Sequence, residues 1–124
     1  MVSEHSIQQR IREHAASLNA RLFRNNVGVL KDDRGQYVAY GLCVGSSDLV
    51  GDYPIDGIAV FLAVEVKRPG QRMTPAQTLF LRSVNDRGGI GIVCDSVENF
   101  ESQLKEKIDD LQQMLRARDS SGVR

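Results

Sequence analysis

Apolar residues near the start of the chain recur at helical spacing. After Ser3, which is suited to an N-cap position, steps of four, four and three residues connect Ile7, Ile11, Ala15 and Leu18. This pattern predicts an amphipathic first helix whose apolar stripe packs against the body of the protein.

Glu4 interrupts this apolar stripe. At about 100° of rotation per residue, the acid falls in the middle of the stripe rather than on the polar side of the helix. Two interpretations remain open at this point. Glu4 faces the body of the protein, or it bends out to water as a first-turn acid that favours the helix dipole.

Strand-like runs occupy residues 21–30 and 37–44, and the polar segment between them contains a glycine. We expect them to form a β-hairpin. A Gly-Ser-Ser break at residues 45–47 then precedes Asp48, and residues 51–57 are dense in turn-forming residues. This predicts a second hairpin.

The run over residues 58–67 has two faces that can be separated at the period of a β-strand. One face is wholly apolar, whereas the other carries Ala59, Phe61 and Ala63 and then changes to Glu65 and Lys67. A strand that is buried on both sides and ends in two charges on one side brings those charges to a site. The simpler alternative is an exposed strand end with a weak surface ion pair.

A second helix is predicted to begin at Thr74, with Pro75 at its first position and Gln77 placed for a capping box, and to end near residues 88–89. A short buried strand over residues 90–94 follows. Asp95 or Ser96 then caps a last helix, whose apolar stripe consists of Val97, Phe100, Leu104, Ile108, Leu111 and Leu115.

This order of elements predicts an α/β or α+β fold with a central mixed β-sheet flanked by helices. The length of 124 residues, 41% of them hydrophobic, suits one domain with an ordinary core. We expect this domain to span residues 1–118 and residues 119–124 to form a disordered tail.

The charge is balanced overall, with 16 basic and 16 acidic residues, so no global positive field attracts a polyanion. Residues 57–94 nevertheless contain five basic residues against two acidic ones. A local phosphate-binding surface needs only a handful of such side chains, although any single one is equally explained as a solvated charge.

The two cysteines, Cys43 and Cys94, lie in apolar surroundings and do not have the spacing of a metal site. We expect both to be reduced and buried. The chain starts without a signal-like segment and contains no run of membrane-spanning length, which predicts a cytoplasmic, intracellular protein without a membrane partner.

Asp48 and Glu65 fit the chemistry of phosphodiester hydrolysis. Hard divalent cations prefer carboxylate oxygens, and a cation relieves the repulsion between two carboxylates on neighbouring strands. Lys67 lies two residues after Glu65, on the same face of the strand, where it can orient a water or stabilise developing negative charge. On spacing alone, Gln77 is explained by the capping box.

Four segments together resemble the VRR-NUC family, a branch of the PD-(D/E)xK nuclease superfamily. They are Ser3-Glu4, Gly45-Ser46-Ser47-Asp48-Leu49, the run from Phe61 to Gly70 with its Glu-x-Lys triplet, and Thr74-Pro75-Ala76-Gln77. The resemblance extends over residues 3–97. It implies a restriction-endonuclease-like core. Ser47 occupies the position of the proline in the superfamily's name, and this branch tolerates serine there.

The resemblance also implies roles for individual residues. Asp48 and Glu65 would bind Mg²⁺ or Mn²⁺ together with the main-chain carbonyl of Val66, and Lys67 would be the catalytic lysine. Gln77 and Glu4 match further catalytic positions of the family. The side chains expected to contact the phosphates of DNA are Arg24, Arg68 and Arg72.

As a whole, the resemblance implies a stand-alone, phage- or virus-type enzyme of replication or repair, acting in a bacterial host. Such a protein would be a homodimeric, metal-dependent endodeoxyribonuclease that cleaves branched DNA, above all four-way (Holliday) junctions, and would use no small-molecule substrate. Two alternatives remain. One is a nucleic-acid-binding protein without activity, and the other is a module whose last helix docks a partner through Leu104, Ile108, Leu111 and Leu115.

Overall fold

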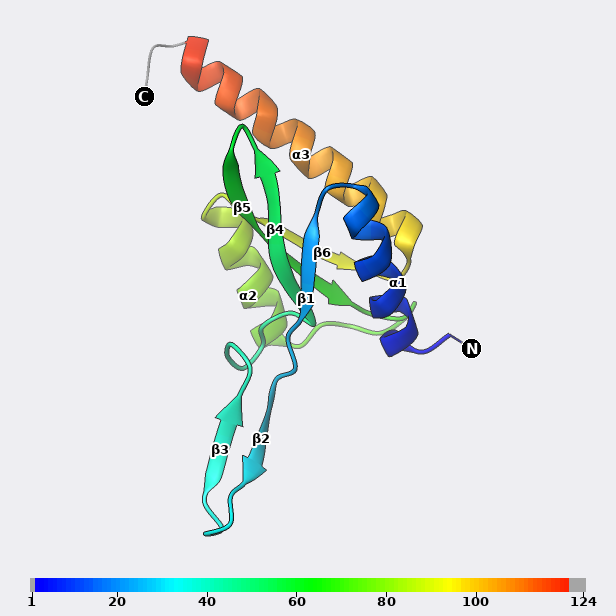
Figure 1. Ribbon diagram of the computed structural model, residues 1–124, viewed down its shortest axis with the longest axis vertical. Helices are drawn as coiled ribbons and strands as arrows, with labels where there is room; N and C mark the ends of the chain where they lie inside the picture. Colours follow the sequence, from blue (N-terminus) through cyan, green and yellow to red (C-terminus); the bar gives the residue numbers. More distant parts are fainter. Residues whose placement is uncertain (1, 121–124) are drawn as a thin grey trace.

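The computed structural model describes residues 2–120 as a mixed α and β domain (Figure 1). The helices are α1 (Glu4–Ser17), α2 (Pro75–Asp86) and α3 (Val97–Ser120). The strands are β1 (Arg21–Arg24), β2 (Gly28–Lys31), β3 (Tyr37–Tyr40), β4 (Leu49–Ile55), β5 (Ile58–Val66) and β6 (Ile90–Cys94).

The central sheet has the order β1-β4-β5-β6. β4 pairs antiparallel with both of its neighbours, whereas β5 and β6 run parallel, so the sheet is mixed as predicted. β2 and β3 form a separate antiparallel hairpin that projects from one end of the domain (Figure 1). We call this hairpin, residues 28–40, the arm.

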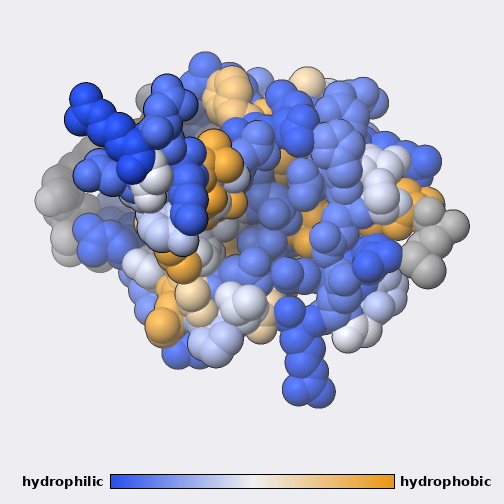
Figure 2. Space-filling model, turned by 90° about the horizontal axis from the view of Figure 1, so that it is seen from below, coloured by the Kyte–Doolittle hydropathy of each residue, from blue (hydrophilic) through white to orange (hydrophobic). Residues whose placement is uncertain are grey.

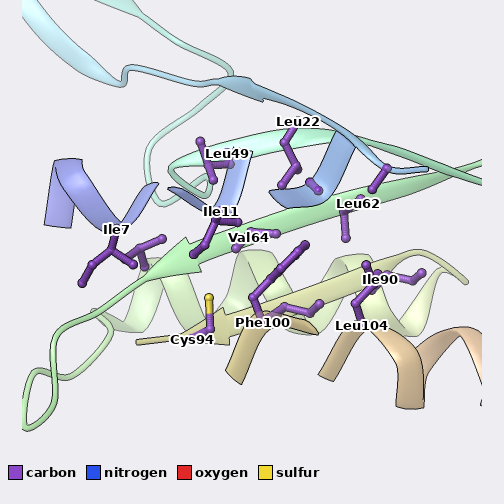
Figure 3. Close-up of a cluster of buried hydrophobic side chains, with 14 residues drawn as sticks. Ile7, Ile11, Leu22, Leu49, Leu62, Val64, Ile90, Cys94, Phe100 and Leu104 are labelled. Carbon is purple, nitrogen blue, oxygen red and sulfur yellow. The ribbon is translucent and has the colours of Figure 1, made fainter. Parts of the chain in front are cut away.

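Helices cover the two faces of the central sheet unequally. α1 and α3 pack on one face, where Ile11, Leu62 and Phe100 lie at the centre of the main apolar core (Figure 3). On the other face, α2 packs over β5 and β6, and its Leu81 and Val84 contact Ala63. The predicted architecture of a central mixed sheet flanked by helices is therefore confirmed.

The first predicted hairpin is only partly correct. The run over residues 21–30 is not one strand, because β1 pairs with β4 in the central sheet and β2 belongs to the arm. The break falls at Asn25, whose side-chain amide donates to Ser46 Oγ and to the carbonyl of Ser47, both at 2.8 Å. These bonds tie the chain to the loop before β4, and the ladder with β4 ends there.

The predicted turn over residues 51–57 is also too long. β4 continues to Ile55, and the reversal uses only Asp56 and Gly57, both of which have positive φ angles. Gly51 lies within the sheet and not in the turn. Its lack of a side chain allows β1 to approach β4, since a Cβ atom there would collide with the main-chain carbonyl of Arg21.

Burial along β5 is less complete than the pattern suggests. Only Leu62–Val66 is buried, whereas the side chains of Ile58 and Phe61 are 58% and 43% exposed. The strand therefore projects past the core at its beginning and enters it toward its end. The charged end of the strand is thus the buried end.

Three further expectations concern the cysteines, the last helix and the tail. Cys94 is buried, but Cys43 is exposed, so the prediction for Cys43 is wrong; it lies in the loop after the arm, away from the core. Leu104 is buried in the core, and Ile108 and Leu111 pack against it, so this part of the predicted docking stripe is already covered. α3 includes the first two residues of the expected tail, and residues 121–124 lie outside the described residues.

Within residues 2–120, no helix is both long and apolar enough to cross a membrane.

Candidate active site

Asp48 and Glu65 meet at the end of the sheet from which the arm projects. Leu49 pairs with Val64, and continuing this antiparallel register by one residue places Asp48 opposite Glu65. Asp48 is held on two sides. Its Oδ2 accepts a hydrogen bond from the amide of Val66 at 2.9 Å, and its carbonyl accepts one from the amide of Asn25 at 2.8 Å.

Glu65 is almost fully buried, with 1% of its surface exposed, and its Oε2 has no hydrogen-bond partner among the described residues. Burial raises the pKa of Glu65 to about 9, and the hydrogen bond and charge repulsion with Asp48 act in the same direction. The positive charge of Lys67 partly opposes this shift. Without a cation, this carboxyl group holds a proton at neutral pH.

This arrangement fits a bound divalent cation. A buried carboxylate oxygen without a partner is costly, and a second carboxylate beside it adds repulsion. A cation removes both penalties at once, and hard cations such as Mg²⁺ are bound through one or two carboxylates together with waters. Asp48 and Glu65 supply this donor set, and the main chain of Val66 lies against Asp48.

The other predicted acid, Glu4, begins α1 and is half-buried. It does not simply bend away from the protein, because its negative charge contributes to raising the pKa of Glu65, although it is the smallest of the named causes. Within residues 2–120, no group of three His, Cys, Asp or Glu side chains is placed to share a metal ion. Glu4 therefore influences the carboxylate pair through its charge.

Lys67 directly follows the last residue of β5. Its amide donates to the carbonyl of Cys94 at 2.9 Å, which extends the parallel pairing with β6 and fixes the main chain at this point. The side chain is half-buried, and its charge acts on Glu65. These contacts place a cation beside the carboxylate pair.

Gln77 forms the capping box that its spacing predicts. The Gln77 amide donates to Thr74 Oγ1 at 3.2 Å, and Gln77 Oε1 accepts from the Thr74 amide at 2.9 Å. The same side chain lines a pocket that Asp48 also borders. Gln77 thus caps α2 at a position next to the carboxylates.

The three predicted phosphate-contacting arginines lie at the same end of the sheet. Arg24 is the exposed last residue of β1, and its Nη2 lies 3.2 Å from His5 Nδ1. Arg68 and Arg72 belong to the loop between β5 and α2, where the Arg68 amide donates to Gln71 Oε1. Figure 2 views the molecule from this end and shows a mainly hydrophilic surface with separate hydrophobic patches.

Sequence reasoning did not identify the residues that support Asp48. The Asn25 side chain accepts from the Leu42 amide and donates to the segment of Ser46 and Ser47, both of which are buried. Gly45, with a φ of 86°, packs directly against the main chain of Ala76 in the first turn of α2. A pair of asparagines inside an otherwise strand-like run was the available signal.

A mixed sheet flanked by helices, with carboxylates at adjoining strand ends, is consistent with a restriction-endonuclease-like fold. A model of the VRR-NUC domain matches residues 2–98, and the chain belongs to this family. Membership implies a nuclease-type function that acts on DNA. Comparisons with curated proteins and with solved structures gave no significant match.

Proposed function

We propose that the protein is an endodeoxyribonuclease that requires Mg²⁺ or Mn²⁺ and hydrolyses phosphodiester bonds. The observation that carries this proposal is the buried Glu65 carboxyl group, whose Oε2 has no hydrogen-bond partner within residues 2–120 and whose neighbour is a second acid. Asp48 and Glu65 would hold the cation, with the Val66 carbonyl as a further ligand. A bound cation of this kind supplies polarisation of the phosphoryl oxygen and activation of a water.

The chain's own residues would divide the remaining work. Lys67, beside the carboxylates, would orient the attacking water and stabilise the negative charge that develops on the phosphoryl oxygens. Arg24, Arg68 and Arg72 would contact phosphates on either side of the cut. Such contacts fix the position of the substrate but do not read its sequence.

We further propose that two copies of the chain act together on branched DNA, with four-way junctions as the favoured substrate. Two active sites related by a two-fold axis could cut symmetric strands. Exposed apolar surface supports self-association. α2 leaves part of its face of the sheet uncovered, and the side chains of Phe23 and Phe61 there are 54% and 43% exposed.

The experiment that tests the activity compares a labelled four-way junction with a linear duplex of the same sequence. Each is incubated with the purified protein in Mg²⁺, Mn²⁺ or EDTA, with Glu65→Gln as the matched control. Metal-dependent, paired cuts in the junction alone support the whole proposal. Metal-dependent cutting of the linear duplex at the same rate as the junction would support the nuclease activity and reject the preference for junctions.

Light scattering on the purified protein tests the pairing. A mass of twice 13.8 kDa is expected. A mass of 13.8 kDa for the free protein, together with a complex that contains one protein chain per junction, would reject the homodimer without affecting the nuclease assignment. Absence of cleavage with either metal would favour the alternative of a binding module that is inactive or depends on a partner.

A further inference from the structure

A pocket of about 790 Å³ opens beside Asp48, and no role proposed so far accounts for it. Its size lies within the range of small-ligand sites, roughly 300–1,000 Å³. The lining comes from α1, from the link between β1 and β2, from the arm and from the start of α2. Together with the loop between β3 and β4 that carries Asp48, five separate segments converge next to a carboxylate of the proposed active site.

The charge of this lining argues against a phosphate as its occupant. Asp48 is the single charged residue among those that line it, and neither Lys nor Arg takes part. Phosphate sites in proteins commonly include cationic side chains. The first turn of α2 also borders the pocket, but the Gln77 amide there already donates to Thr74 Oγ1. A negative wall without cations favours a neutral group that is partly polar and partly apolar.

Side-chain amides supply the polar part of the lining. Gln8 and Asn26 both line the pocket and carry side-chain amides. Gln77 uses only Oε1 in the capping box, which leaves its Nε2 group for a ligand. Amide side chains match the donor and acceptor edges of nucleobases, as in the pairing of Asn or Gln with adenine.

The arm supplies the apolar part. Leu30 and Tyr40 both line the pocket, and the register puts them on the same face of the hairpin. The Tyr40 ring lies over Gly28, where any side chain would collide with it. An aromatic ring and an aliphatic side chain on one wall are the surfaces on which bases stack in single-stranded nucleic acids.

We propose that this pocket holds an unpaired nucleobase from the nucleotide next to the scissile phosphate. A base within a continuous duplex would have to leave its stack to enter, and this costs least for a base that is mismatched or already single-stranded. The pocket thereby selects DNA with an unpaired nucleotide at the cut. This inference rests on the proposed nuclease function and specifies the substrate of the same site.

The test uses a fluorescent adenine analogue, 2-aminopurine, placed at the nucleotide on either side of the cut mapped with the wild-type protein. Binding is followed by fluorescence in the Glu65→Gln background without metal, so that the readout does not depend on cleavage. We expect the signal to change at least twofold on binding at one of these positions. Tyr40→Ala and Gln8→Ala should reduce the change, and Tyr40→Phe should retain it.

Tyr37→Ala is the matched control, because Tyr37 is 73% exposed and lies on the opposite face of the arm. It should leave the signal unchanged. DNA binding with unaltered fluorescence at both positions would overturn the proposal that the pocket holds a base. An equal loss of the fluorescence change in Tyr40→Ala and Tyr37→Ala would also overturn it. If the wild-type protein cuts no DNA, the analogue is placed at the branch-point nucleotides of a four-way junction instead. A fluorescence change there that is lost in Tyr40→Ala but not in Tyr37→Ala would support the pocket and reject the nuclease.

Discussion

Asp48 and Glu65 face each other at the point where β4 begins and β5 approaches its end, yet their surroundings differ. Asp48 accepts a main-chain hydrogen bond from the residue that follows Glu65, whereas Glu65 Oε2 is buried and has no hydrogen-bond partner in the described part of the chain. The Asp48 side chain is therefore held in place by the main chain, whereas the charge of Glu65 depends on what binds beside it.

The raised pKa of Glu65 predicts how the stability of the metal-free protein depends on pH. An unfolded Glu65 ionises near its ordinary pKa of 4.5, whereas the folded protein retains this proton up to about 9. Between these values the folded state binds the additional proton. The free energy of unfolding should therefore decrease as pH rises, by up to about 1.4 kcal/mol per pH unit from this group.

Urea unfolding in EDTA at pH 5.5, 7.0 and 8.5 measures this slope. Glu65→Gln removes the titrating group at nearly constant side-chain volume. Its free energy of unfolding should therefore vary less with pH than that of the wild type. Added Mg²⁺ should raise the wild-type melting temperature more at pH 8.5 than at pH 5.5, because the cation competes with the proton. An equal dependence of the free energy of unfolding on pH in the two proteins would contradict the raised pKa of Glu65.

Glu65→Gln should also separate cleavage from binding. The substitution removes a charge that is expected to hold metal rather than phosphate, so cleavage should be lost while affinity for branched DNA stays within a few-fold of the wild type. Gel-shift titration in EDTA and a cleavage assay in Mg²⁺ provide the two readouts. Cleavage near the wild-type rate would reject Glu65 as a metal ligand.

Gln77 combines a structural bond with a place beside Asp48, and two substitutions separate these roles. Gln77→Ala removes half of the capping box and should cost about 1 kcal/mol of stability in addition to lowering activity. Gln77→Glu retains a capping acceptor but replaces the amide with a second negative charge. Its stability should match the wild type while its cleavage rate falls. Full activity in Gln77→Glu would limit this residue to the cap.

Gly51 provides a test of the fold that does not involve the site chemistry. An added Cβ would collide with the Arg21 carbonyl across the β1–β4 pair, so Gly51→Ala must separate these two strands. We expect a loss of roughly 2–4 kcal/mol, at the upper end for single substitutions. Gly57→Ala is the control for introducing a side chain, because a Cβ at Gly57 meets nothing within 4 Å and its cost comes only from the positive φ.

Local sequence patterns predicted much of the fold, but the remaining features depend on contacts between distant segments of the chain. The spacing of apolar residues in α1, the capping box at Thr74 and the two-faced pattern before Glu65 were all sufficient for prediction. The partners of a strand are set by tertiary packing, and for this reason one run was divided between the sheet and the arm at Asn25. The predicted burial of Cys43 was wrong for the same reason, since its apolar neighbours lie in an exposed loop after the arm and do not form a core.

The candidate site shows a similar division. Glu65 could be identified because its strand changes abruptly from apolar to charged, and the structure places Asp48 beside it. The support from Asn25 and the pocket under the arm could not be predicted. The Asn25 hydrogen bonds join residues 17 to 22 positions apart, and the pocket brings together segments from Gln8 to Gln77. No local period marks such contacts.

Lys67 should contribute to the rate more than to binding. Its main chain is pinned to Cys94, so a change of side chain leaves β5 and β6 paired and removes only the cation beside the carboxylates. Lys67→Ala should lower the single-turnover cleavage rate by about 10²–10³-fold, the usual effect of losing one group that stabilises transition-state charge. Affinity for uncut DNA in EDTA should change little. Because Lys67 lowers the pKa of Glu65, the variant should also need a higher pH or more Mg²⁺ to reach its maximal rate. A loss of affinity as large as the loss of rate would instead make Lys67 a phosphate-binding residue.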